Sequence, residues 1–130
     1  METVYTVTNY YDGPTRGVAD FGGAPHAYES LLDATEDERD STFMLRPIDH
    51  DTLELVLEGW RIWLRWRRAF DEGQAGIETH PALPQDRPRH DQISLILEGR
   101  LKIDPATTLK AKGHFEVIDG GWKVRWGPVV

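Results

Sequence analysis

The residues with the clearest potential for chemistry lie near the N-terminus of the sequence. His26, Tyr28 and Glu29 fall within one short segment, in which a histidine and a carboxylate could act as general acid and base. Further polar residues lie close by in the sequence: Tyr10, Tyr11, Asp12, Arg16 and Asp20. One face of a curved sheet could gather them into a pocket around His26 and Glu29. The simpler interpretation is that tyrosines suit strands and that Asp12 and Arg16 flank a turn.

The histidines do not predict a metal site. No two of the five have the HExxH spacing or another short ligand spacing, and the chain has no cysteine. His80 and His90 would be the first candidates, with Asp86 or Asp91 as a third ligand. The simpler interpretation is that His80 shapes a loop before Pro81 and that His90 lies on a helix surface. We therefore expect no metal and no cofactor.

Other motifs for catalysis and nucleotide binding are missing from the sequence. None of the serines, which are Ser30, Ser41 and Ser94, lies in a GxSxG motif. The sequence has neither a Walker A motif nor GxGxxG. Its glycine pairs, Gly22-Gly23 and Gly120-Gly121, lie between expected strands and so predict hairpin turns instead of phosphate-binding loops.

A run of tryptophans marks the long helix that we expect in the middle of the chain. Leu53, Trp60 and Trp63 recur at helical spacing, which predicts a face buried against a sheet. Trp66 falls toward the edge of this face, beside Arg65. Aromatic and arginine side chains are enriched at protein interfaces. Trp66 and Arg65 are therefore our candidate interface residues.

Composition restricts the class of protein. The chain has 130 residues and a net charge of −7, which argues against a nonspecific nucleic-acid binder. Residues 1–58 hold 3 basic and 13 acidic side chains, whereas residues 59–130 hold 12 basic and 9 acidic ones. The halves could pair within the fold, or an acidic face could bind a basic partner. Because no apolar run or signal-peptide pattern is visible, we expect a cytoplasmic protein that does not contact a membrane.

The pattern of apolar residues predicts a mixed fold. Strands are expected at Val4 to Tyr11, Gly17 to Phe21, Pro25 to Leu32, Ser41 to Arg46, Thr107 to Ile118 and Trp122 to Trp126. The acidic run from Asp33 to Asp40 predicts an exposed loop. A helix of ~22 residues follows Pro47 and ends before Gly73, and Asp86 can cap a second helix. Residues 93–103 fit a helix, which we favour, or a strand.

These elements follow the order β-β-β-β-α-α-β-β. Short turns between consecutive strands favour antiparallel pairing. We therefore expect one α+β domain over residues 1–130, an antiparallel sheet with the helices packed on one of its faces.

Several segments resemble a family of small uncharacterised bacterial proteins, a domain of unknown function. They are Tyr10-Tyr11-Asp12-Gly13-Pro14, Pro25-His26-Ala27-Tyr28-Glu29, His80-Pro81-Ala82-Leu83-Pro84 and Trp60-Arg61-Ile62-Trp63-Leu64-Arg65-Trp66. The resemblance implies a bacterial, cytoplasmic, stand-alone domain. It implies no activity.

Two functions follow as hypotheses. The first is a noncatalytic cytoplasmic binding or protein-interaction domain, with a protein partner or a second copy of the chain. The second is a small enzyme or ligand-binding protein with a pocket near His26 and Glu29. A deep cavity where those side chains converge would favour the second hypothesis, and an apolar surface patch would favour the first.

The absence of ligand spacing predicts that the purified protein contains no structural zinc. Elemental analysis should find no stoichiometric zinc, and a chelator should leave the melting temperature unchanged. A zinc-dependent fold would lose stability on chelation, because metal binding would contribute to its folding free energy. Near-stoichiometric zinc with a large fall in melting temperature would contradict the prediction and make His80 and His90 the first ligands to test.

Overall fold

The fold is taken from a computed structural model that describes residues 1–8, 15–31, 40–106 and 108–129. The chain divides into two compact units. The first comprises Met1–His50 and Leu101–Val130, and the second comprises Asp51–Arg100. The prediction of a single domain over residues 1–130 stays a prediction.

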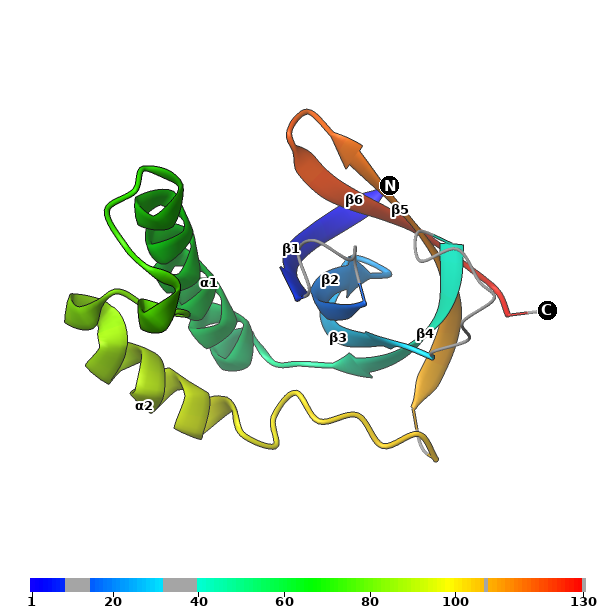
Figure 1. Cartoon of the computed structure of the whole chain (residues 1–130). Helices are drawn as coiled ribbons and strands as arrows, with labels where there is room; N and C mark the ends of the chain where they lie inside the picture. Colours follow the sequence, from blue (N-terminus) through cyan, green and yellow to red (C-terminus); the bar gives the residue numbers. More distant parts are fainter. Residues whose placement is uncertain (9–14, 32–39, 107, 130) are drawn as a thin grey trace. The chain divides into compact units, whose positions relative to one another are not determined.

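The first unit is a closed antiparallel barrel of six strands (Figure 1). The strands are β1 (Glu2–Thr8), β2 (Arg16–Phe21), β3 (Ala24–Ser30), β4 (Asp40–Pro47), β5 (Leu109–Ile118) and β6 (Gly121–Gly127). Each strand pairs with its neighbours in sequence, and β1 also pairs with β6, with Glu2 opposite Val124 and Thr3 opposite Lys123. This last pairing joins segments from opposite ends of the chain.

The closed barrel corrects the predicted fold class. The elements do follow the order β-β-β-β-α-α-β-β. However, the prediction of an α+β fold, with an antiparallel sheet and helices packed on one face, is wrong because β6 returns to β1 and closes the sheet. The alternation of apolar and polar residues indicates which face of a strand is buried. It does not indicate which distant strand pairs with it. Closure also leaves no sheet edge without a neighbouring strand.

Two-residue turns join β2 to β3 and β5 to β6. In the first, Phe21 pairs with Ala24 across Gly22 and Gly23, whose φ angles are 63° and 81°. In the second, Asp119 and Gly120 have φ angles of 53° and 78°. Positive φ at both positions is typical of the type I′ turn, which matches the twist of the flanking strands. Both predicted hairpin turns are confirmed.

Aromatic side chains fill the inside of the barrel. The buried core consists of Ala19, Tyr28, Phe43, Leu45, Ala111, Phe115 and Val124, with Trp126 packed against it. The ring centroids of Phe43 and Phe115 lie 5.1 Å apart, and each lies 5.7 Å from that of Trp126. The Tyr28 hydroxyl donates to the Thr6 carbonyl at 2.9 Å, and burial raises the pKa of Tyr28 above its ordinary value. The inner polar groups are thus bonded as well as buried.

A second apolar cluster lies on the outside of β3 and β4. Ala27 and Met44 contribute from the strands and Ile103 from the segment that returns to β5, with Leu31, Ile48 and Leu101 around them. The Arg46 guanidinium donates to the carbonyl of Lys102 at 2.7 Å, and the Thr108 hydroxyl donates to the carbonyl of Leu45. These bonds hold the returning segment against β4.

The second unit is helical. It contains α1 (His50–Asp71), the short 3₁₀ helices η1 (Ile77–Thr79) and η2 (Pro84–Asp86), and α2 (Arg87–Leu97). Its core consists of Ile62 on α1, Ala82 between η1 and η2, and Ile93 on α2, with Leu55 and Leu97 around them. We predicted that residues 93–103 are helical. Residues 93–97 are, as the last part of α2, but the helix ends at Leu97 and does not continue to residue 103. No helix among the described residues is long and apolar enough to span a bilayer.

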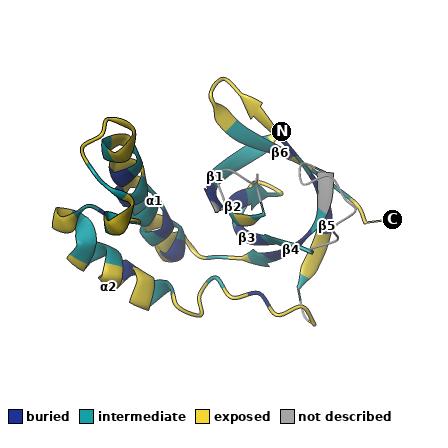
Figure 2. Ribbon diagram, viewed as in Figure 1, coloured by how far each residue is buried: buried dark blue, intermediate teal, exposed yellow. Residues whose placement is uncertain are grey.

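The buried face of α1 differs from the predicted one. The buried residues are Thr52, Val56, Ile62 and Trp66, whereas Leu53, Trp60 and Trp63 are only partly buried (Figure 2). The prediction of a face formed by Leu53, Trp60 and Trp63 is therefore wrong. Apolar side chains occur around more than half of this helix, so that spacing alone could not select the face that packs against α2.

The aromatic core explains why Gly113 lies on β5 opposite Trp126. A Cβ atom at Gly113 would lie 2.6 Å from Cζ3 of Trp126 and 2.9 Å from Cδ2 of Phe43. We expect Gly113→Ala to lower the free energy of unfolding by about 1–3 kcal/mol, because both rings must move. Urea unfolding would measure the loss.

Gly127→Ala provides the control for this substitution. A Cβ atom at Gly127, also on the β5–β6 hairpin, would meet no atom within 4 Å. Its effect should stay within about 0.5 kcal/mol. Equal losses in the two variants would contradict the proposed crowding at Gly113.

Candidate functional site

The predicted acid–base residues do not converge. Successive side chains of a strand point to opposite faces, so Tyr28 and His26 share the inner face of β3 while Glu29 lies on its outer face. His26 is 7% exposed, its Nδ1 lies 2.8 Å from the Ala24 carbonyl, and its ring packs edge-on to Phe21. The structure therefore separates His26 from Glu29.

The other described members of that polar group do not gather around His26. Asp20 accepts a hydrogen bond from the Tyr5 hydroxyl at 2.9 Å, and Arg16 pairs across the strands with Glu29. Tyr10, Tyr11 and Asp12 lie outside the described residues, as does most of the predicted acidic loop, residues 33–39. No pocket around His26 can be built from the described part of this group.

The candidate interface residue Trp66 is buried within the helical unit. It is 3% exposed, and its indole Nε1 donates to Oγ1 of Thr79 at 2.9 Å. Its ring stacks on Phe70 with centroids 5.1 Å apart and meets His80 edge-on at 4.6 Å. Trp66 thus anchors η1 against α1, and its ring is not on the surface of the unit.

Two arginine–carboxylate pairs fasten the small helices to α1. Arg65, the other candidate interface residue, donates to both oxygens of Asp86 at 2.9 Å. Arg89 similarly donates to both oxygens of Glu58. These hydrogen bonds hold the pKa of the Asp86 and Glu58 carboxyls below their ordinary values. Two parallel hydrogen bonds between a guanidinium and a carboxylate fix the orientation of the two groups as well as the distance between them.

The candidate metal ligands have other roles. His80 packs on Trp66, and Nδ1 of His90 lies 3.1 Å from a carboxylate oxygen of Asp91. Within the described ranges, no three or more histidines and carboxylates gather with the geometry of a metal site. The expectation of no metal stays a prediction.

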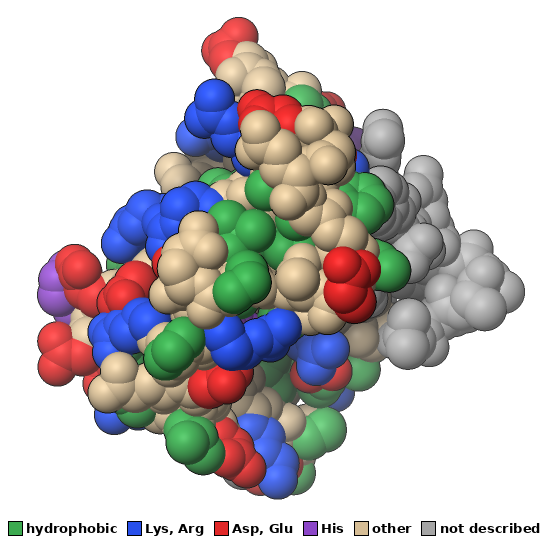
Figure 3. Space-filling model, turned by 60° about the vertical axis from the view of Figure 1, so that its left-hand side comes forward, with side chains coloured by type: hydrophobic (Ala, Val, Ile, Leu, Met, Phe, Trp, Pro, Cys, Tyr) green, Lys and Arg blue, Asp and Glu red, His purple; other side chains and the backbone are tan. Residues whose placement is uncertain are grey.

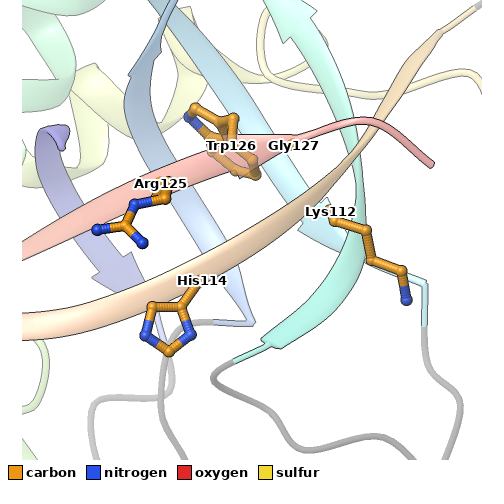
Figure 4. A pocket seen from close by; sticks show the side chains of 5 residues that line it. All are labelled: Lys112, His114, Arg125, Trp126 and Gly127. Carbon is orange, nitrogen blue, oxygen red and sulfur yellow. The ribbon is translucent and has the colours of Figure 1, made fainter. Parts of the chain in front are cut away.

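A hollow of about 180 Å³ lies on the β5–β6 hairpin (Figure 4). Its described lining consists of Lys112 and His114 from β5 and Arg125, Trp126 and Gly127 from β6. His114 lies directly opposite Arg125, and Lys112 lies opposite Gly127. Because Gly113 and Trp126 face the core, these three basic residues belong to the outer face. The missing side chain at Gly127 leaves space beside Lys112.

The outer face of this hairpin is basic. It carries Lys110, Lys112, Lys123 and Arg125, against one carboxylate, Glu116, which lies 2.8 Å from Nε2 of His114. Within the described part of the chain, Lys110, Lys123 and Arg125 form no ion pair. The sequence shows these residues alternating along each strand, but only the pairing register places Arg125 opposite His114. The alternation along each strand does not by itself predict this hollow.

A second surface feature lies on α1. Leu53, Leu57, Trp60 and Leu64 recur at helical spacing, roughly a third of a turn from the buried face. Leu64 is 43% exposed and the others are partly buried. None of the four belongs to a core cluster found among the described residues. Trp60 stacks on Trp63 with ring centroids 5.0 Å apart. We call these four residues the α1 stripe.

Comparison of the chain with protein-family models, with curated proteins and with solved structures finds no match. The resemblance to small uncharacterised bacterial proteins stays a prediction. Function is therefore inferred from the α1 stripe and the arrangement of the predicted site residues.

The placement of Trp66 predicts a structural role for this residue. We expect Trp66→Ala to lower the free energy of unfolding of the helical unit by about 3–5 kcal/mol, because it removes a large buried ring and leaves a cavity. Urea unfolding followed by circular dichroism of the helices would measure this loss. Leu95→Ala is the control, because Leu95 on α2 is 72% exposed, and it should cost less than about 1 kcal/mol. A small loss for Trp66→Ala would contradict its place in the core.

Proposed function

We propose that the chain is a noncatalytic cytoplasmic protein-interaction domain that binds a second copy of itself through the α1 stripe. The observation that carries this proposal is the stripe itself: Leu53, Leu57, Trp60 and Leu64 form an apolar surface that no core cluster of the described chain uses. Figure 3 shows that hydrophobic side chains form patches among charged ones on one face of the molecule. Apolar patches rimmed by polar residues are typical of interaction surfaces.

The interior of the barrel supports a noncatalytic role. Packed aromatic rings occupy the space in which a barrel protein would hold a small ligand. His26 and Glu29, the expected acid and base, lie on opposite faces of β3. The geometry thus favours binding by an outer surface over chemistry in an inner pocket.

The spacing of the α1 stripe suits antiparallel pairing of two copies. In an antiparallel pair of identical helices related by a two-fold axis, two residues face each other when they lie at equal distances along the helix on either side of the axis. The pairs Leu53–Leu64 and Leu57–Trp60 share one midpoint, between Glu58 and Gly59. An axis at this point therefore packs Leu53 against Leu64 of the second copy and Leu57 against its Trp60. The stripe is self-complementary in this arrangement.

Charges beside the stripe favour the same arrangement. The first half of α1 carries the acidic residues Asp51, Glu54 and Glu58, whereas the second half carries Arg61, Arg65, Arg67 and Arg68 against Asp71. Glu54 and Arg61 flank the same side of the stripe, and their midpoint lies within one residue of the proposed axis. Antiparallel pairing thus places each Glu54 near Arg61 of the second copy, whereas parallel pairing would bring like charges together.

Sedimentation equilibrium over a wide range of protein concentration tests self-association. We expect the parent chain to form a dimer and Leu57→Glu to remain monomeric, because a carboxylate would be buried at the centre of the interface. Leu95→Glu is the matched control, since Leu95 on α2 is 72% exposed and lies outside the stripe. It should dimerise like the parent. A monomeric parent, or equal loss in both variants, would contradict the proposal.

A charge exchange tests the antiparallel arrangement. Arg61→Glu should weaken dimerisation, because it places two carboxylates together on each side of the axis. The double variant Glu54→Arg with Arg61→Glu should restore dimerisation. Loss without restoration would contradict the antiparallel arrangement, provided that circular dichroism shows an intact helix in both variants.

A further inference from the structure

We propose that the barrel opens at the seam where β1 pairs with β6, and that the side chain of Trp126 holds this seam closed. The seam is short. Glu2 lies opposite Val124. Thr3 lies opposite Lys123, and no other pair of described residues joins the two strands. By contrast, β5 and β6 pair along their whole hairpin. The barrel is therefore closed by its shortest pairing.

A bend in β1 explains why the seam is short. The register of β1 against β2 shifts between Val4 and Thr6. An extra residue at such a position bends its strand and increases the local twist. Beyond this point β1 continues along β2, with Val7 opposite Gly17. Only the start of β1 therefore runs beside β6 (Figure 1).

Side-chain hydrogen bonds attach β1 to β2 and to the turn that follows it. The Tyr5 hydroxyl donates to the Asp20 carboxylate at 2.9 Å. The amides of Gly22 and Gly23 donate to the carboxylate of Glu2 at 3.2 and 2.7 Å. Because the two glycines form the β2–β3 turn, these bonds join β1, β2 and β3 into one piece. The β5–β6 hairpin is the piece on the other side of the seam.

Trp126 connects the two pieces. It is the one β6 side chain with a hydrogen bond to β1, β2 or β3 among the described residues: its indole Nε1 donates to the Asp20 carbonyl at 2.7 Å. Its ring also lies 6.0 Å from that of Phe21 and 6.4 Å from that of Tyr28, measured between centroids. The contact of Trp126 with Phe115 lies within the hairpin. Opening thus breaks the first three contacts and keeps the last, so it requires less than unfolding of the whole barrel.

Hydrogen exchange of the full chain, followed by NMR, tests the opening. Opposite residues of an antiparallel pair alternate between hydrogen-bonded and non-hydrogen-bonded, and the pair beside a two-residue turn is hydrogen-bonded. Counted from the β5–β6 turn, the amides of Lys123 and Arg125 point to β5 and that of Val124 points to β1. After correction for intrinsic rates, we expect Val124 to exchange at least about tenfold faster than its two neighbours, because opening exposes its amide. Equal rates would mean that the seam opens only when the whole barrel unfolds, and would overturn the proposal.

A disulfide across the seam tests whether opening is the cause of this exchange. By the same alternation, Thr3 and Lys123 form a non-hydrogen-bonded pair, whose Cα atoms lie about 4.5 Å apart, within the range of a disulfide. The double variant Thr3→Cys with Lys123→Cys contains no competing cysteine. In its oxidised form, Val124 should exchange less than about twofold faster than Arg125, and reduction of the same protein should restore the difference. A difference that persists in the oxidised form would overturn the proposal.

Two tryptophan variants test the role of Trp126. Trp126→Phe removes the indole N–H but keeps an aromatic ring, and it should speed exchange at Val124 by about three- to tenfold, because the closed state loses a hydrogen bond. Trp122→Phe is the matched control, since Trp122 packs against the same core from the same strand and its side chain forms no hydrogen bond within the described residues. It should change exchange at Val124 less than about twofold. Equal acceleration by both variants would overturn the assignment of Trp126.

Discussion

The aromatic cluster inside the barrel is the contact on which the rest of the first unit depends. Tyr28, Phe43, Phe115 and Trp126 come from four different strands and meet at the barrel centre. Each of these side chains fixes which face of its strand points inward, because successive residues alternate. The inward position of Trp126 places Arg125 on the outside, and the inward position of Phe115 places His114 there. The basic hollow is therefore a consequence of how the core packs.

Close packing around this cluster also constrains the backbone. Gly113 leaves room for the rings of Phe43 and Trp126, and Gly17 lies beside the Tyr28 hydroxyl and the Thr6 carbonyl. The register of β1 against β2 shifts between Val4 and Thr6, and there the Val18 amide donates to the Thr6 hydroxyl. The side chain thus replaces a backbone acceptor at the irregularity, as expected for buried polar groups.

The helical unit has a different source of order. It has a small apolar core, and its short helices are held by directed polar contacts: Arg65 with Asp86, Arg89 with Glu58, and the Trp66 indole with Thr79. Such contacts specify orientation more than they add stability. Because these contacts and the apolar core occupy one part of α1, a second apolar surface is left outside the core of the described unit. The proposed self-association uses this surface.

The amino-acid sequence by itself determined the local elements. The turn chemistry of Gly22-Gly23 and Asp119-Gly120, the alternation along β5 and β6, and the length of α1 are all readable from it, because each depends on neighbours only a few residues apart. The tertiary structure alone decided the closure of β1 on β6, the buried face of α1, and the separation of His26 from Glu29. It also decided that Arg125 lies opposite His114. These features depend on pairing and packing between segments that are distant in the sequence. The same local spacing of apolar residues is compatible with several pairing strands or packing faces. Only the packed chain selects one.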